Sequence, residues 1–228
     1  MENFNKNTID PNKFLIKNVT GDNACFYRAL GLFIYFATPY LEINKVKRFY
    51  KWGKCKKIDD LLKDENKQEE LARFIQDKIV DYIATHANEI IPETQMSIAK
   101  TIELVHNISI EEYLSYYTVF AGDIDLEMQE ENIYFERWGS IVEQYVISKI
   151  IKCPIIVYNT QKWDKNYNKI VNGKVIKDKP EKGVRLKITS ILGKNFNNKM
   201  PICLIWREYR KNGHYLVCYP KNPSSNLN

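Results

Sequence analysis

The order of two hydrophobic patterns along the 228-residue chain constrains its fold most strongly. Between residues 25 and 151, apolar residues recur at the three- and four-residue spacing of amphipathic helices. After residue 153, short runs of β-branched and aromatic residues alternate with turn-forming residues, which is typical of strands. Helices first and strands later predict an α+β fold, in which a mixed sheet packs against helices and a helical insertion lies between.

The elements can be placed from these periods and from the turn signals between them. Helices are expected at residues 25–37, 68–88, 93–106, 109–121 and 138–151. Strands are expected at residues 153–159, 184–191, 201–206 and 214–219, with a hairpin at 170–175 that turns at Asn-Gly. The last two strands are expected to pair with each other. The Asn-rich residues 1–12 and residues 221–228 are predicted to be flexible tails of one domain, 13–220.

Composition excludes several classes of function. The net charge of +6 comes from dispersed basic residues without a nucleic-acid motif, so we expect a solvated surface and no specific nucleic-acid partner. No run approaches the length of a membrane span, and no membrane partner is expected. Five cysteines without a CxxC pair and only three histidines argue against a metal site and for free thiols in a reducing compartment. No cofactor is expected.

Cys25 and His214 are the candidate reactive pair. Cys25 follows two good N-cap types, Thr20 and Asp22, and begins a helical pattern. Free backbone N–H groups and the helix dipole at such a position favour a thiolate and can hold an oxyanion. His214 opens a strand 189 residues later, so only the fold can bring the two together. This arrangement is typical of cysteine proteases.

Three blocks of sequence resemble the ovarian-tumour (OTU) family of cysteine deubiquitinases, whose fold is papain-related. Residues 21–30 read Gly-Asp-Asn-Ala-Cys-Phe-Tyr-Arg-Ala-Leu, similar to the family's nucleophile motif Gly-Asp-Gly-Asn-Cys-Leu-Phe-Arg-Ala/Ser-Leu. Residues 138–143 read Trp-Gly-Ser-Ile-Val-Glu, similar to the family's Trp-Gly-Gly-x-x-Glu. His214-Tyr215 is similar to its His-aromatic pair. The blocks occur in the family's order over residues 21–219.

The resemblance implies a thiol-dependent ubiquitin hydrolase. Such an enzyme cleaves the isopeptide or peptide bond after the C-terminal glycine of ubiquitin, or of a ubiquitin-like modifier, through a thioester on Cys25, with His214 as base. The implied partners are ubiquitin and polyubiquitin chains, or another ubiquitin-like modifier. The expected protein is a cytoplasmic monomer, or one that acts in the host cytosol if it is viral or a secreted bacterial effector.

Three positions depart from the family's motifs, and they bear on which residue serves as the third catalytic residue. Asn23 and Ala24 replace the motif's glycine and asparagine, and Leu216 stands where many members carry an Asp or Asn that orients the histidine. We therefore predict that Asp22 orients His214, with Asn212 and Asn18 as the next options. The expected oxyanion loop consists of Asp22, Asn23, Ala24 and Cys25.

The predicted substrate contacts are acidic or aromatic residues and one glycine. The acidic run 123–131 precedes the Trp-Gly block and matches the two arginines before the Gly-Gly end of ubiquitin. An ordinary solvated loop explains this run equally well. The expected contacts are Asp123, Asp125, Glu127, Trp138, Gly139 and Tyr215.

Two alternatives belong to other functional classes. Ala24 and Leu216 are compatible with a ubiquitin-binding module whose catalysis is impaired. The Cys–His pair is also compatible with a papain-like thiol hydrolase that acts on another substrate.

Overall fold

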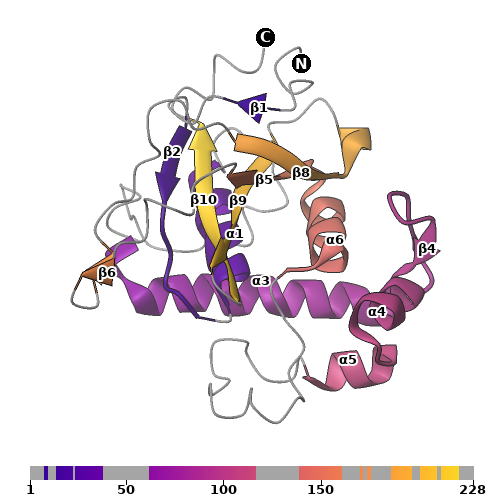
Figure 1. Cartoon of the computed structure of the whole chain (residues 1–228). Coiled ribbons are helices and arrows are strands. Elements are labelled where there is room, and N and C mark those ends of the chain that lie inside the picture. Colours follow the sequence, from indigo (N-terminus) through magenta and orange to yellow (C-terminus); the bar gives the residue numbers. More distant parts are fainter. Residues whose placement is uncertain are drawn as a thin grey trace.

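A six-stranded mixed sheet forms the frame of the protein (Figure 1). The computed structural model describes residues 8–9, 14–22, 24–37, 62–116, 139–160, 170–171, 174–175, 186–196, 201–209 and 212–220. The sheet runs in the order β1 (Thr8–Ile9), β8 (Leu186–Leu192), β5 (Ile155–Thr160), β9 (Ile202–Tyr209), β10 (Asn212–Pro220) and β2 (Phe14–Lys17). β5 and β9 are parallel, and the other neighbours are antiparallel.

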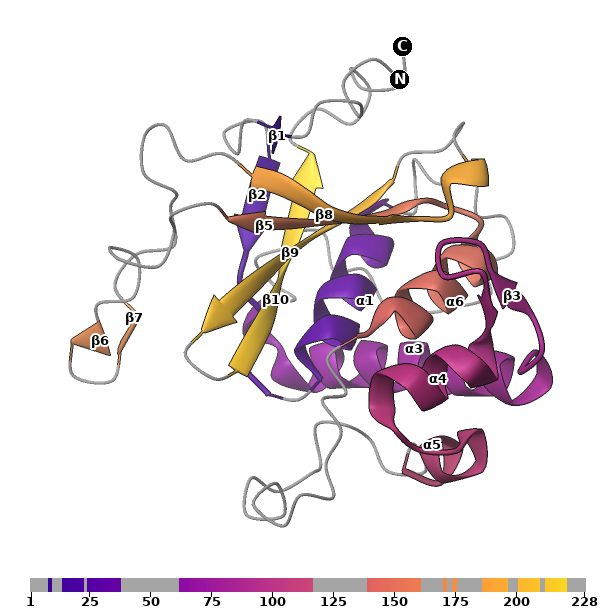
Figure 2. The same cartoon turned by 45° about the vertical axis from the view of Figure 1, so that its right-hand side comes forward.

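The helices gather on one face of this sheet (Figure 2). They are α1 (Cys25–Ala37), α3 (Glu65–Thr85), α4 (Ile98–His106), α5 (Ile110–Tyr116) and α6 (Ile141–Ile151). α1 lies between the sheet and α3, and every side chain from Cys25 to Ile34 is buried. The α1–α3 approach is close at Gly31, where an added Cβ would lie 3.0 Å from Leu71 Cβ. The predicted α+β class is confirmed, since helices pack on a mixed sheet.

The predicted hairpin of the last two strands is also confirmed. β9 and β10 are antiparallel neighbours, with His214 opposite Arg207 and Tyr215 opposite Trp206. Two short antiparallel pairs complete the described strands: β3 (Ile90–Ile91) with β4 (Met96–Ser97), and β6 (Ile170–Val171) with β7 (Lys174–Val175). The latter is the pair expected around the Asn-Gly turn.

Two expectations from the sequence are corrected. The helix expected from residue 93 begins only at Ile98, because residues 90–97 form the β3–β4 pair and Ser97 caps α4 by accepting a bond from Lys100 N at 3.1 Å. Thr8–Ile9, expected in a flexible tail, pairs with Lys187 and Leu186 of β8. Residues 221–228, the other expected tail, lie outside the described residues.

Helix ends elsewhere follow their capping residues. Asp64 caps α3 by accepting from Lys67 N at 3.1 Å, and Ser140 caps α6 by accepting from Val142 N at 3.2 Å. α3 therefore begins at Glu65, three residues before its predicted start, and α6 begins at Ile141, three residues after its predicted start. Ser109 likewise accepts from Glu112 N at the start of α5. None of the helices in the described part of the chain combines the length and apolarity needed to cross a membrane.

Candidate active site

Cys25 lies where the first turn of α1 meets strand β10. It is the first residue of α1, and its side chain is only 1% exposed. The backbone N–H of Tyr215 donates to Cys25 Sγ at 3.5 Å across 190 residues of sequence. The fold thus places the thiol beside the chain segment that carries His214.

The His214 imidazole is held by Asn18. Its Nε2 lies 2.7 Å from Asn18 Oδ1. Asn18 follows directly after β2, and β2 pairs with β10 from Lys17–Val217 to Phe14–Pro220, so the register brings the two side chains together. An amide oxygen accepts a hydrogen bond, which puts the imidazole proton on Nε2 and leaves Nδ1 as the basic nitrogen.

Asp22 does not take the place that the sequence predicts for it. Its carboxylate instead binds the buried guanidinium of Arg28, with Asp22 Oδ2 2.9 Å from Arg28 Nε and 2.6 Å from the terminal Arg28 Nη2. The reason lies one turn into α1, where Arg28 is surrounded by apolar side chains and requires a charged acceptor. Of the three candidates for orienting His214, Asn18 makes the contact; the side chain of Asn212 lies outside the described residues.

The predicted oxyanion loop is tightly hydrogen-bonded within itself. Asp22 Oδ1 accepts from Ala24 N at 3.1 Å, and the Asp22 carbonyl accepts from Cys25 N at 3.2 Å. The Ala24 N–H therefore has an acceptor inside the loop. Asn23 lies outside the described residues. The N–H groups of Cys25 and Phe26 both lower the pKa of the thiol, so the start of α1 does favour negative charge at this point.

Two predicted substrate contacts are buried in the structure. Tyr215 is 5% exposed, and its hydroxyl donates to the Gly139 carbonyl at 2.9 Å. Gln144 Nε2 donates to the same carbonyl at 2.8 Å and contacts the Tyr215 hydroxyl at 3.2 Å. Gly139 and Tyr215 thus join the start of α6 to β10 behind the thiol. Trp138, Asp123, Asp125 and Glu127 lie outside the described residues.

Glu143, in the same block, is a buried structural carboxylate. It accepts hydrogen bonds from the hydroxyls of Ser140 and Tyr113. The Trp-Gly block therefore connects α5 to the start of α6 through these hydrogen bonds, next to Gly139.

Aromatic rings pack around the backbone of β10 on either side of His214. A Cβ added to Gly213 would lie 1.5 Å from the Trp206 ring, so this position admits only glycine. The Trp206 and Tyr215 rings are 4.8 Å apart, and Phe26 packs edge-on against Tyr215 at 5.1 Å. These contacts fix the strand that carries the imidazole.

Burial controls the ionisation of the Cys25 thiol. Desolvation raises its pKa to about 11, and the charge of Asp22 acts in the same direction. Hydrogen bonding from the N–H groups of Tyr215, Phe26 and Cys25 lowers the pKa but does not offset burial. Cys25 is therefore a neutral thiol at pH 7, whereas its place at a helix start alone suggests a thiolate.

Burial also keeps His214 neutral. Desolvation, together with the cationic Arg207, its cross-strand partner on β9, lowers its pKa to about 4. The Asp22 charge opposes this effect. At pH 7 the site thus holds a neutral thiol and a neutral imidazole.

The low pKa of His214 predicts a loss of stability in mild acid. The unfolded imidazole takes up a proton near pH 6.5, whereas the folded one does so only near pH 4, so stability falls as the pH drops through this window. Between pH 7 and pH 5 the His214 contribution should fall by at most ~2 kcal/mol. Urea unfolding at both pH values should show a smaller loss for His214→Gln than for wild type. Equal losses would show that His214 is not kept neutral by the fold.

The described residues outside this site do not form a metal centre. Among them, no group of three or more His, Cys, Asp or Glu side chains is placed to hold a metal ion. The His86 ring stacks on Tyr82, with centroids 4.0 Å apart, and the His106 ring packs against Tyr113 at 5.3 Å, so both histidines have packing roles.

The chain matches no protein-family model. A search of curated proteins likewise finds no significant match.

Proposed function

We propose that the protein is a cysteine protease of the OTU type that removes ubiquitin, or a ubiquitin-like modifier, from conjugates. The observation that carries the proposal is the Cys25–His214–Asn18 arrangement. Cys25 begins α1, its sulfur meets the backbone of β10 beside His214, and Asn18 contacts Nε2 of the imidazole. Cys, His and Asn in these roles form the catalytic set of papain-like proteases.

The proposed reaction begins with the neutral pair. His214 Nδ1 takes the proton of the Cys25 thiol as Sγ attacks the carbonyl carbon of the modifier's C-terminal glycine. The Phe26 N–H in the first turn of α1, which already favours negative charge on the sulfur, stabilises the oxyanion. Collapse of this intermediate breaks the C–N bond, and His214 gives its proton to the leaving amine. Water then cleaves the thioester, which releases the modifier's carboxylate and restores the thiol.

The choice of ubiquitin rests on the three sequence blocks. Their residues gather around one point: Cys25 and Phe26 from the first block, Gly139 from the second, and Tyr215 from the third are linked by hydrogen bonds and ring contacts. The four cysteines of the described residues are free thiols, which suits a reducing compartment where ubiquitin conjugates occur.

A hydrolysis assay tests the proposal. Ubiquitin carrying a fluorophore on its C-terminal carboxyl as an amide should be cleaved by wild type, with release of free ubiquitin and dye. Wild type that cleaves a small thiol-protease ester but no ubiquitin or ubiquitin-like conjugate would instead be a thiol hydrolase with another substrate.

One observation favours the second candidate, a ubiquitin-binding module without turnover. The thiol is 1% exposed and un-ionised at pH 7, so a substrate must reach a shielded, weakly nucleophilic sulfur. This candidate predicts saturable ubiquitin binding by calorimetry and no dye release at any pH.

Asn18 should matter more for catalysis than any residue that follows His214. Asn18→Ala removes the acceptor that sets the imidazole tautomer, and we expect kcat to fall by roughly 10- to 100-fold, a loss of about 1.4–2.7 kcal/mol of transition-state stabilisation. Asn18→Asp keeps an acceptor at the same position and should retain more activity than Asn18→Ala. Steady-state kinetics on the ubiquitin amide provide the measurement. Wild-type kcat in Asn18→Ala would remove Asn18 from the site.

A further inference from the structure

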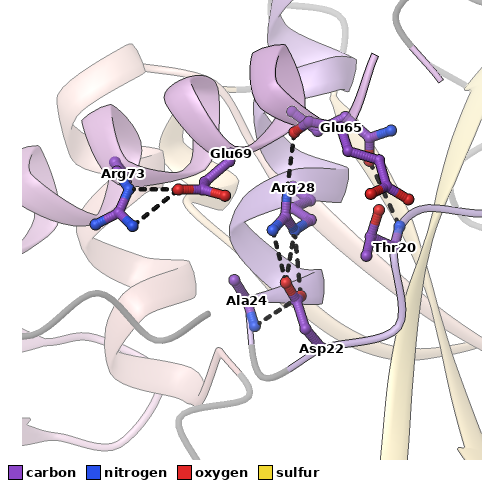
Figure 3. Close-up of polar contacts among 8 residues, drawn as sticks. Thr20, Asp22, Ala24, Arg28, Glu65, Glu69 and Arg73 are labelled. Carbon is purple, nitrogen blue, oxygen red and sulfur yellow. Dashed lines mark hydrogen bonds and ion pairs between the residues drawn. The ribbon is translucent and has the colours of Figure 1, made fainter. Parts of the chain in front are cut away.

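Arg28 holds the loop that precedes Cys25 by an ion pair with Asp22, called the clamp below. Figure 3 shows the Arg28 guanidinium directed at the Asp22 carboxylate, with Ala24 N–H directed at the same group. Arg28 Nε reaches both oxygens, at 2.9 Å and 3.2 Å, and Arg28 Nη2 reaches Asp22 Oδ2 at 2.6 Å. The Arg28 side chain is 5% exposed and that of Asp22 22% exposed, so the pair is largely shielded from water.

The clamp is anchored on a second helix. Arg28 Nη1 lies 3.4 Å from the carbonyl oxygen of Glu65, the first residue of α3. Thr20, at the other end of the loop, donates its N–H to Gln68 Oε1 at 3.4 Å, and Gln68 Nε2 donates to the Leu62 carbonyl at 3.0 Å. The start of α3 therefore supports the loop from Thr20 to Cys25 at two points (Figure 3).

We propose that Arg28 is a positioning residue that sets the shape of the oxyanion loop by holding Asp22, and that Asp22 acts through this loop rather than on His214. The proposal rests on the proposed function for its catalytic consequence. Its geometric part stands on the contacts alone: Arg28 fixes the Asp22 carboxylate, that carboxylate fixes Ala24 N–H, and the Asp22 carbonyl receives Cys25 N–H. A planar guanidinium with two parallel bonds is required here, because an ammonium cannot reproduce the fork.

The substitution Arg28→Lys tests the fork while it keeps the charge. We expect kcat on the ubiquitin amide to fall 10- to 100-fold with KM within about threefold, because Arg28 is buried and acts only on the geometry of the transition state. Asp22→Asn changes the more exposed partner of the same ion pair and should lower kcat by a similar factor. The double variant Asp22→Asn/Arg28→Lys should be no slower than the slower single variant, because both break one unit.

The matched control lies in the same view. Arg73 and Glu69 form an ion pair on α3 at 2.8 Å, far more exposed than the clamp, and Arg73→Lys should leave kcat and KM unchanged. Wild-type kcat in both Arg28→Lys and Asp22→Asn would overturn the proposal. So would a multiplicative loss in the double variant.

Amide exchange separates this proposal from the proposed function. With selective ¹⁵N-alanine labelling, the Ala24 amide should exchange at least tenfold faster in Arg28→Lys than in wild type, while Ala29, deep in α1, should not change. If wild type cleaves no ubiquitin conjugate and Ala24 is still deprotected in the variant, the ubiquitin function fails and the clamp stands. Equal Ala24 exchange in the two proteins refutes the clamp whatever the activity.

Discussion

His214→Gln should lower kcat on a ubiquitin amide by at least about 10³-fold, or some 4 kcal/mol of transition-state stabilisation. The thiol is un-ionised at pH 7, so attack requires a base beside it, and glutamine provides none. The variant keeps a polar side chain of similar length. Its folded fraction, measured by urea unfolding at pH 7, should stay close to that of wild type, because the glutamine amide can donate to Asn18 Oδ1 as the imidazole does.

A second histidine provides the control for this prediction. His86 is exposed, forms the C-cap of α3 and stacks on Tyr82. His86→Gln should retain wild-type kcat and KM. Comparable losses in the two variants would mean that the assay reports stability and not the base at residue 214.

Gly139→Ala should be strongly destabilising, because it combines backbone strain with a steric clash. Gly139 has φ of 72°, and an added Cβ would lie 2.2 Å from Cγ of the Phe26 ring. The strained backbone and the displaced ring together should lower the free energy of unfolding by about 3 kcal/mol. Because Phe26 follows Cys25, the repacking should also lower activity per folded molecule.

Gly21→Ala is the matched control for Gly139→Ala. The nearest atom to a Cβ at Gly21 is His214 Cε1 at 4.0 Å, which is ordinary van der Waals distance. Chemical denaturation should place Gly21→Ala within about 0.5 kcal/mol of wild type. Equal stability of Gly139→Ala and wild type would contradict the close packing of Phe26 on the α6 start.

Local patterns predicted much of the frame. The apolar spacing after Cys25 predicted α1, and the alternating residues around His214 predicted β10 and its pairing with β9. The late start of α4 was missed because the extended Ser97 that ends the β3–β4 pair has no periodic signal. The parallel pairing of β5 with β9 depends on tertiary packing.

The contact between Asn18 and His214 is one that no local pattern reports. Asn18 reaches His214 because β2 pairs with β10, and a four-residue strand near the N-terminus has little sequence signal. The engagement of Asp22 with Arg28 had a signal: an arginine inside an apolar helix requires an anion, and Asp22 is the acidic residue just before that helix. For the motif around Cys25, this rule predicts that Asp22 binds Arg28 and not the His214 imidazole.

The most direct test of the central claim is a covalent ubiquitin probe with an electrophile in place of its C-terminal carboxyl. Wild type should form one adduct, and peptide mapping by mass spectrometry should place it on Cys25. Cys25→Ala should form none, although Cys153, Cys203 and Cys218 remain as buried free thiols. An adduct that persists in Cys25→Ala, or a wild type that binds the probe without forming a covalent bond, would contradict the assignment of Cys25 as the nucleophile of a ubiquitin hydrolase.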